Sequence, residues 1–225
     1  MTAIKLVSYT KPTEEFEKEG IVNAQDLIAF CARVSNPSAQ INSETSEKLI
    51  KYLIKHQHWS PLEMVNAVLE INTTRDIAHQ IVRHRSFSFQ EFSQRYADPT
   101  EELEFVFRDA RLQDPKNRQN SIPTNDVLLQ AHWEEMQRKV IEASKNAYNF
   151  AINRGIAKEQ ARAVLPEGNT VSRLYVNGTL RSWIHYIELR GANGTQLEHI
   201  ELAHAIADVI TKIFPLAKEF KGKEI

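Results

Sequence analysis

The longest uninterrupted periodic segment of this sequence runs from Asp126 to Asn153. That length and spacing predict one long α-helix, which Gly155 ends. We expect its apolar face to pack into the core, with Trp133 and Met136 as core residues rather than cofactor contacts. The apolar residues three or four positions apart are Leu129, Trp133, Met136, Val140, Ala143, Ala147 and Phe150.

Shorter strand and helix patterns surround this helix. Strand-like stretches occupy 4–9, 65–71 and 170–176, and the alternation is clearest in the second of them. Helical patterns occupy 24–34, 43–54, 74–82, 158–165, 179–189 and 195–214. Expected N-terminal caps are Asn23, Ser43, Thr73 or Thr74, and a capping box of Thr195 with Glu198. The polar stretch from Arg108 to Pro123 is expected to be a loop.

These elements indicate an α+β fold, a helix-rich single domain over residues 1–225 with a small antiparallel or mixed sheet. No internal repeat or linker-like stretch divides the chain. The order of the strands does not follow from the sequence.

Charge and cysteine content exclude several classes of protein. The net charge is −1, from 28 basic and 29 acidic residues, so we expect no broad nucleic-acid or membrane surface. No apolar run approaches the ~20 residues that span a bilayer, and the N-terminus does not resemble a signal peptide. Cys31 is the single cysteine, which fits a reducing, cytoplasmic setting.

The segment from Arg83 to Tyr96 holds the most chemical information. Arg83 and Arg85 lie on either side of His84, and their positive charges repel each other unless an anion binds between them. Aromatic residues at 87, 89, 92 and 96 imply packing that holds the polar residues between them. Hydroxyl and guanidinium donors at Ser93 and Arg95 suit a phosphate. The alternative is a basic helix end followed by a solvated aromatic loop.

This segment resembles the signature of the flavin-dependent thymidylate synthases, which is Arg-His-Arg, seven residues, then Ser. The resemblance extends over most of the chain. The family's further blocks match Ala32-Arg33-Val34-Ser35, His56 to Glu63, Ala161 to Pro166, and Arg181-Ser182 through Leu189-Arg190. Gln90 and Thr179 stand where relatives often have asparagine, and the interval from Arg162 to Arg190 is one residue longer than usual.

The resemblance implies methylation of dUMP to dTMP, with methylenetetrahydrofolate as carbon donor and NADPH-reduced FAD as hydride source. It implies catalytic roles for Arg190 and Ser93, and a homotetramer with active sites between chains. The implied FAD-binding residues are Ser35, Ser60, Arg83, His84, Arg85, Glu91, Thr179, Arg181 and His185. The implied dUMP-binding residues are Gln80, Arg83, Glu91, Ser93, Gln94, Arg95, Arg162 and Arg190.

Cys31 lies on the apolar stripe of its predicted helix, so a buried structural thiol is expected rather than a nucleophile. Activation of the uracil ring would then be electrostatic. With no adjacent base evident, Ser93 is expected to contact phosphate rather than attack substrate. Arg162 could instead be a surface arginine, and Arg190 a cation at a helix C-terminus.

No metal-binding or catalytic role is predicted for the histidines outside the motif. His56 and His58, two positions apart, lack the further ligands of a zinc site, so no metal is predicted. His199 and His204 are expected on a helix surface.

Two rival functions stay open on sequence grounds. One is a flavin-dependent methyltransferase acting on another uracil-containing substrate, such as RNA. The other is a nucleotide-binding module without catalysis.

Overall fold

A four-stranded antiparallel sheet forms the centre of the computed structural model, which describes residues 3–221. Its strands are β1 (Ala3–Tyr9), β2 (Asn66–Thr74), β6 (Val171–Thr179) and β3 (Ser88–Glu91), in the order β1-β2-β6-β3. β2 and β6 pair along their whole length, from Asn66 opposite Thr179 to Thr74 opposite Val171. The predicted α+β fold with a small antiparallel sheet is confirmed.

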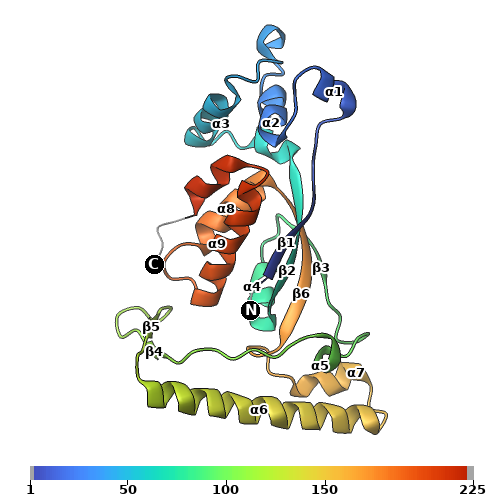
Figure 1. Ribbon diagram of the computed structural model, residues 1–225, viewed down its shortest axis with the longest axis vertical. Helices are drawn as coiled ribbons and strands as arrows, with labels where there is room; N and C mark the ends of the chain where they lie inside the picture. Colours follow the sequence, from blue (N-terminus) through green and yellow to red (C-terminus); the bar gives the residue numbers. More distant parts are fainter. Residues whose placement is uncertain (1–2, 222–225) are drawn as a thin grey trace.

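One face of the sheet is buried under helices. Alternate residues of each strand point to that face, because side chains on a strand point in turn to its two sides. Ala67, Leu69 and Ile71 of β2 are fully buried, as are Leu174 and Val176 of β6. The main core packs them against α4 (Arg75–Ile81), α8 (Leu180–Arg190) and α9 (Leu197–Thr211). These three helices lie together along the sheet in Figure 1. Thr74 ends β2 and precedes α4, so one continuous segment links the sheet to the Arg83 motif.

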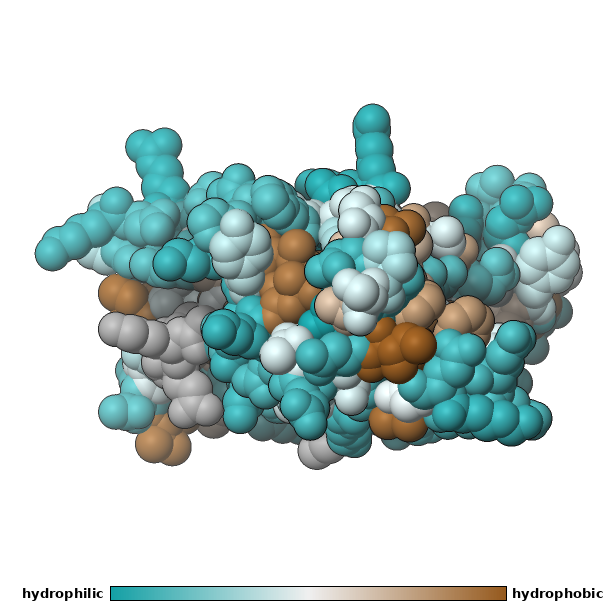
Figure 2. Space-filling model, turned by 90° about the horizontal axis from the view of Figure 1, so that it is seen from above, coloured by the Kyte–Doolittle hydropathy of each residue, from teal (hydrophilic) through white to brown (hydrophobic). Residues whose placement is uncertain are grey.

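The N-terminal helices gather at one end of the molecule (Figure 1). They are α1 (Glu14–Lys18), α2 (Ala24–Ala32), η1 (Pro37–Ala39), α3 (Ser46–Lys55) and η2 (Ser60–Met64). The Asn23 side chain caps α2 by accepting from the Asp26 amide at 3.0 Å, as predicted. The predicted Ser43 cap is wrong, because α3 begins at Ser46 after Thr45. Seen from this end, the surface is mostly polar, with apolar side chains in separate groups (Figure 2).

The long helix α6 (Val127–Asn153) lies across the opposite end of the molecule (Figure 1). Its Asp126 cap is formed, but the predicted packing face is wrong. Trp133 is 44% exposed and Met136 is 56% exposed. The buried side of α6 instead presents Gln137, Ile141, Ser144, Tyr148 and Ala151. Periodicity identified a real apolar stripe, but it did not reveal that this chain leaves the stripe uncovered.

Short elements connect α6 to the rest of the fold. They are α5 (Pro99–Glu102), β4 (Arg111–Gln113), β5 (Ser121–Pro123), α7 (Lys158–Ala161) and η3 (Arg162–Val164), whereas η4 (Pro215–Phe220) follows α9 and packs in the main core. β4 and β5 pair as a small hairpin, so the predicted loop from Arg108 to Pro123 is partly wrong. No helix in residues 3–221 is long and apolar enough to cross a membrane.

The start of α9 also differs from its prediction. The capping box is not formed, since the Thr195 hydroxyl donates to the Leu189 carbonyl and Glu198 pairs with Arg111. α9 begins at Leu197, after Gln196. His199 is fully buried rather than on the surface, and His204 is partly exposed.

Candidate active site

Arg190 and His84 meet where α8 ends and the loop after α4 begins. The Arg190 Nε donates to the His84 Nε2 at 2.9 Å. An imidazole nitrogen accepts a hydrogen bond only when it is unprotonated. Burial, together with the charge of Arg190, lowers the pKa of His84 to about 4, so the ring is neutral at physiological pH. The motif histidine therefore supports a guanidinium rather than adding a third positive charge.

The Arg190 guanidinium is positioned by this contact, not by the helix end. Arg190 is the last residue of α8, and it is partly exposed. Its Nε is occupied by His84, and its two terminal nitrogens have no partner among residues 3–221. Those two nitrogens form a planar pair of donors that faces away from the imidazole. The helix-cation interpretation does not explain the imidazole contact.

Aromatic rings hold His84 from the other side. Its ring lies edge-on to Tyr186, with centroids 4.9 Å apart, and near Phe87 at 6.4 Å. Phe87 packs on Trp183 at 4.5 Å and over the backbone of Gly178. A Cβ on residue 178 would lie 2.2 Å from the Phe87 ring, so only glycine fits there. The predicted packing is thus confirmed for Phe87, but it is wrong for Tyr96, which is 84% exposed.

A second group of predicted site residues lies beyond the end of β3. Ser93 is partly exposed, and its Oγ accepts from the Arg95 amide at 3.3 Å. The Arg95 side chain is 61% exposed and lies 3.7 Å from Glu159. Gln94 is only 3% exposed, yet its Nε2 has no hydrogen-bond partner among residues 3–221. Arg162 in η3 is partly exposed and makes no ion pair within the described chain.

Glu91 is anchored inside the chain. It accepts from the Ser172 hydroxyl at 2.7 Å and lies 3.6 Å from Arg75. Ser172 is buried on β6, next to β3. The carboxylate therefore has a fixed place on the edge strand of the sheet.

A third group lies at the start of α8. The Thr179 hydroxyl caps α8 by accepting from the Ser182 amide at 3.2 Å. Arg181 is ion-paired with Glu63 of η2. His185 lies edge-on to Trp59, with centroids 4.5 Å apart, and burial lowers its pKa. Ser60 begins η2, and exposed Ser35 follows α2, so both belong to the same end of the molecule.

The exposed arginines of the motif provide a test of whether anionic cofactors fit. Arg83 and Arg85 are exposed, and neither has an ion pair or a side-chain hydrogen bond within residues 3–221. Two unpaired guanidinium groups beside a neutral imidazole suit the phosphates of a dinucleotide such as FAD. These residues therefore fit the predicted cofactor.

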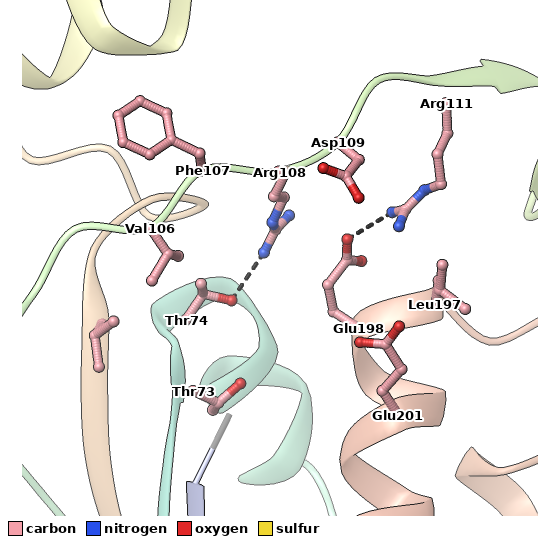
Figure 3. Close-up of a pocket in the computed structure, with 11 residues that line it drawn as sticks. Thr73, Thr74, Val106, Phe107, Arg108, Asp109, Arg111, Leu197, Glu198 and Glu201 are labelled. Carbon is pink, nitrogen blue, oxygen red and sulfur yellow. Dashed lines mark hydrogen bonds and ion pairs between the residues drawn. The ribbon is translucent and has the colours of Figure 1, made fainter. Parts of the chain in front are cut away.

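Within residues 3–221, hydrogen bonds and ion pairs do not join the predicted site residues into one network. No side-chain hydrogen bond or ion pair in the described chain joins Arg190 to Ser93, Arg95 or Arg162. A polar pocket of about 220 Å³ lies nearby, lined by Arg108, Arg111 and Glu198 among others, and none of the predicted site residues lines it (Figure 3). Its two arginines already face carboxylates, Asp76 and Glu198.

Cys31 is less buried than expected, and the paired histidines His56 and His58 lie beside Tyr52 rather than among the motif residues. Cys31 is partly exposed, not buried, because α2 ends at Ala32 and the following Val34 is 70% exposed. Burial still raises the pKa of the thiol, which opposes a nucleophilic thiolate. The rings of His56 and His58 lie 6.2 Å apart beside Tyr52. No group of three potential metal ligands occurs among the described residues.

Comparison with known proteins decides the family. The model of the thymidylate synthase complementing proteins matches residues 19–216. A probable flavin-dependent thymidylate synthase of Paramecium bursaria Chlorella virus 1 is 51% identical over 211 residues, covering 94% of each chain. The chain belongs to the flavin-dependent thymidylate synthases. Another member, from a Synechocystis species, is 47% identical over 212 residues and covers 94% of this chain and 95% of its own.

The fold is also that of a solved structure, PolB of Streptomyces cacaoi, described as a UMP/dUMP methylase bound with 5-Br dUMP. The TM-score is 0.80 at 23% identity, and the match covers 98% of this chain and 94% of PolB. At that identity the likeness concerns the fold alone. The family resemblance inferred from the sequence motifs is confirmed.

Several residues that support the family motif were not predicted from the sequence. Gln80 lies within a connected series of hydrogen bonds, whose other members are Tyr186, His199, Gln196 and Glu198. Their spacing along α8 and α9 resembles ordinary helix packing. Only the contact between the two helices shows that their polar groups meet.

Proposed function

We propose that this flavin-dependent thymidylate synthase converts dUMP to dTMP with methylenetetrahydrofolate, FAD and NADPH. The observation that supports this best is the Arg190–His84 contact. It leaves two guanidinium donors free at a fixed position, which is what an electrostatically activated uracil ring requires. Residues 1–225 act as one catalytic domain in this proposal. The cytoplasmic setting inferred from the single cysteine stays a prediction.

Arg190 is the proposed catalytic residue at the uracil. C5 of the ring forms a bond to the methylene carbon of the folate and then loses its proton, while the bonds from that carbon to the folate nitrogens break and their electrons return to the folate. Negative charge develops on the ring oxygens when C5 becomes nucleophilic, and the two free nitrogens of Arg190 would stabilise it. Neutral His84 fixes the guanidinium without competing for that charge. The partly exposed Cys31, with its raised pKa, supplies no thiolate for an attack on the ring.

Ser93, Gln94, Arg95 and Arg162 are proposed to bind the phosphate of dUMP. They offer a hydroxyl, an amide and two guanidinium groups, and the weak Arg95–Glu159 contact leaves Arg95 available. The unpartnered Nε2 of buried Gln94 supports this assignment, since such an atom needs an acceptor. Ser93 contacts the ligand as a donor in this scheme and is not a nucleophile. Gln80, Arg83 and Glu91 complete the proposed nucleotide contacts.

The flavin is proposed to lie along the motif and the start of α8. Arg83 and Arg85 would pair with its phosphates, and His84 would lie beside them. Ser35, Ser60, Glu91, Thr179, Arg181 and His185 are the remaining proposed contacts. When bound, FAD supplies the hydride that reduces the transferred carbon to a methyl group, and NADPH is the source of those two electrons.

The chain is proposed to work as a homotetramer whose active sites lie between chains. Two features of the described chain support this. The nucleotide-binding residues divide into groups that share no side-chain hydrogen bond or ion pair. The apolar stripe of α6 also leaves Trp133, Met136, Val140 and Phe150 exposed, which favours burial against another copy.

A spectrum and a turnover assay test the proposed function together. The purified protein should be yellow, with a flavin spectrum that changes when dUMP is added. dTMP should form from dUMP with methylenetetrahydrofolate and NADPH, while UMP and uridine-containing RNA should be poor substrates. A colourless protein that binds dUMP would indicate a binding module instead, and faster methylation of RNA or UMP would reassign the substrate.

A further inference from the structure

Five side chains behind the Arg190–His84 contact form one continuous hydrogen-bonded chain. The Tyr186 hydroxyl lies 2.8 Å from His199 Nε2, and His199 Nδ1 lies 3.2 Å from Gln80 Oε1. Gln80 Nε2 donates to Gln196 Oε1 at 3.1 Å. Gln196 Nε2 donates to Glu198 Oε2 at 3.0 Å. The chain thus runs from a residue packed on His84, through Gln80, to the start of α9.

An anion at one end fixes the direction of every hydrogen bond in this chain. An ionised carboxylate only accepts, so Gln196 must donate to Glu198 through its Nε2. Gln196 Oε1 must then accept from Gln80 Nε2, which turns Gln80 Oε1 toward His199. His199 therefore carries its proton on Nδ1 and accepts from Tyr186 on Nε2. Reversing any one amide would bring two acceptors or two donors together.

Glu198 is held as an anion by Arg111. The Arg111 Nη2 lies 2.6 Å from Glu198 Oε1, as Figure 3 shows. Desolvation opposes ionisation, but a backbone hydrogen bond at Glu198, together with the hydrogen bond and charge of Arg111, outweighs it and lowers the pKa of Glu198. Arg111 lies on β4 of the β4–β5 hairpin, which the sequence patterns did not predict. This hairpin therefore helps to keep the Glu198 carboxylate ionised.

Burial keeps His199 and Tyr186, the other ionisable members of the hydrogen-bonded chain, in their neutral forms. His199 is fully buried, and desolvation together with the charges of Arg190 and His84 lowers its pKa to about 3, against the opposing charge of Asp76. Burial raises the pKa of Tyr186 far above its usual range, so its hydroxyl stays a donor. No proton is gained or lost in this chain near neutral pH.

We propose that His199 is a positioning residue for the nucleotide, holding the Gln80 carboxamide in a single orientation toward bound dUMP. This rests on the proposed function, in which Gln80 contacts dUMP. Gln80 is partly exposed, and its two neighbours occupy one hydrogen of its Nε2 and one lone pair of its Oε1. The remaining hydrogen and lone pair have fixed places, so the ligand meets a donor and an acceptor already oriented.

Without His199, the amide of Gln80 would lose the partner that selects its orientation. A glutamine amide has two nearly isosteric orientations that exchange donor for acceptor. Substrate binding would then have to select one of them. The expected consequence is weaker dUMP binding, by about the worth of one hydrogen bond, or roughly five- to tenfold in Kd.

The test uses the FAD-loaded protein with two aromatic substitutions made together, H199F and Y186F. The double variant keeps both rings and removes the buried hydroxyl that H199F alone would leave without a partner. dUMP is titrated into wild type and variant and followed by the flavin spectrum. We expect the Kd and KM for dUMP to rise about five- to tenfold, with kcat and FAD content nearly unchanged.

Tyr148→Phe is the matched control. Tyr148 is fully buried in a separate cluster, and its hydroxyl has no partner, so this change also removes one buried hydroxyl. Its dUMP affinity should equal that of wild type.

E198Q tests the other end of the chain, because a neutral amide no longer dictates the direction of the hydrogen bonds. Its dUMP affinity should fall without loss of FAD. A dUMP Kd within about twofold of wild type in the folded double variant would overturn the proposal. Parallel loss of FAD would also overturn it, since that indicates general damage to the fold. Failure of wild type to bind dUMP would instead refute the proposed function.

Discussion

The two halves of the proposed nucleotide site differ in how many of their side chains have partners within one chain. At the helix end, Arg190 is hydrogen-bonded to neutral His84, and Gln80 has partners on both sides. Beyond β3, within the part of the chain that the structure describes, Arg162 has no ion pair and Gln94 keeps an unpartnered amide nitrogen. We call these the inner half and the outer half.

The difference corresponds to what each half must do. Groups that stabilise developing charge are most effective when they are held in place before the reaction, which the buried inner half provides. Groups that bind a phosphate gain from being unpaired until the ligand arrives, which the outer half provides. An outer half left open beside an uncovered apolar helix also suggests that another chain contributes to it.

The largest expected effect is at Arg190. Arg190→Lys should keep FAD but lower kcat about 10²–10³-fold, because lysine cannot both donate to His84 and present two parallel donors. Turnover with dUMP, measured beside the flavin spectrum, checks this. Activity within a few-fold of wild type would make Arg190 a simple helix-end cation and remove the inner half from the chemistry.

A charge on the α6 stripe should separate the subunits. Trp133→Glu places a carboxylate on the stripe, where burial against another copy would cost several kcal/mol, so the assembly should dissociate and activity should fall at least about tenfold. Light scattering and turnover at equal protein concentration measure both effects. Asn149→Glu adds the same charge on the other side of α6 and should change neither. A fully active Trp133→Glu monomer would show that one chain holds the whole site.

Acid should weaken the inner half. The folded-state pKa values of His84 and His199, about 4 and about 3, lie below the usual 6.5 because of desolvation, so the unfolded chain binds protons first. Stability is therefore complete above pH 6.5 and lost as pH falls toward the folded values. For fully buried His199 we expect a loss of about 2–3 kcal/mol between about pH 6.5 and pH 4.5.

The free energy of unfolding, measured across this range at fixed protein concentration, checks the acid dependence. The double variant H199F with Y186F should show a shallower slope, because one of the two histidines is gone. Asp76, Arg190 and Tyr186 are the charged or titratable groups that face His199 besides His84, and their charges stay constant in this interval. An unchanged slope in the double variant would mean that the acid effect arises elsewhere.

The smallest effect is expected at Cys31, which belongs to neither half. Cys31→Ser should keep most activity and shift stability by no more than about 1 kcal/mol, since the side chain is partly exposed. Turnover and thermal unfolding measure this. A folded, flavin-loaded Cys31→Ser protein without turnover would refute electrostatic activation by Arg190.

Local patterns in the sequence predicted the elements well but not their surroundings. Alternation in β2 and the cap at Asn23 gave correct elements, because these signals act within a few residues. β3 was not predicted as a strand, since it is four residues long and is defined by pairing with β6. The stripe on α6 was correctly found and wrongly assigned to the core, because periodicity does not say what covers a face.

The site divides in the same way. The motif spacing predicted Arg83, Ser93 and Arg95 as site residues because they are close in the sequence, and these assignments stay predictions. His199 was wrongly expected on a surface, since nothing along α9 reveals that Tyr186 and Gln80 lie opposite it. The neutral state of His84 likewise depends on burial and on the charge of Arg190, which is 106 positions away in the sequence.

Co-expression of two inactive variants tests most directly whether the halves come from different chains. Arg190→Lys disables the inner half, and Arg162→Ala disables the outer half. If each site combines the inner half of one chain with the outer half of another, random mixing restores roughly a quarter of wild-type activity. Activity no greater than that of the two variants measured separately would contradict the account, because it would place both halves in a single chain.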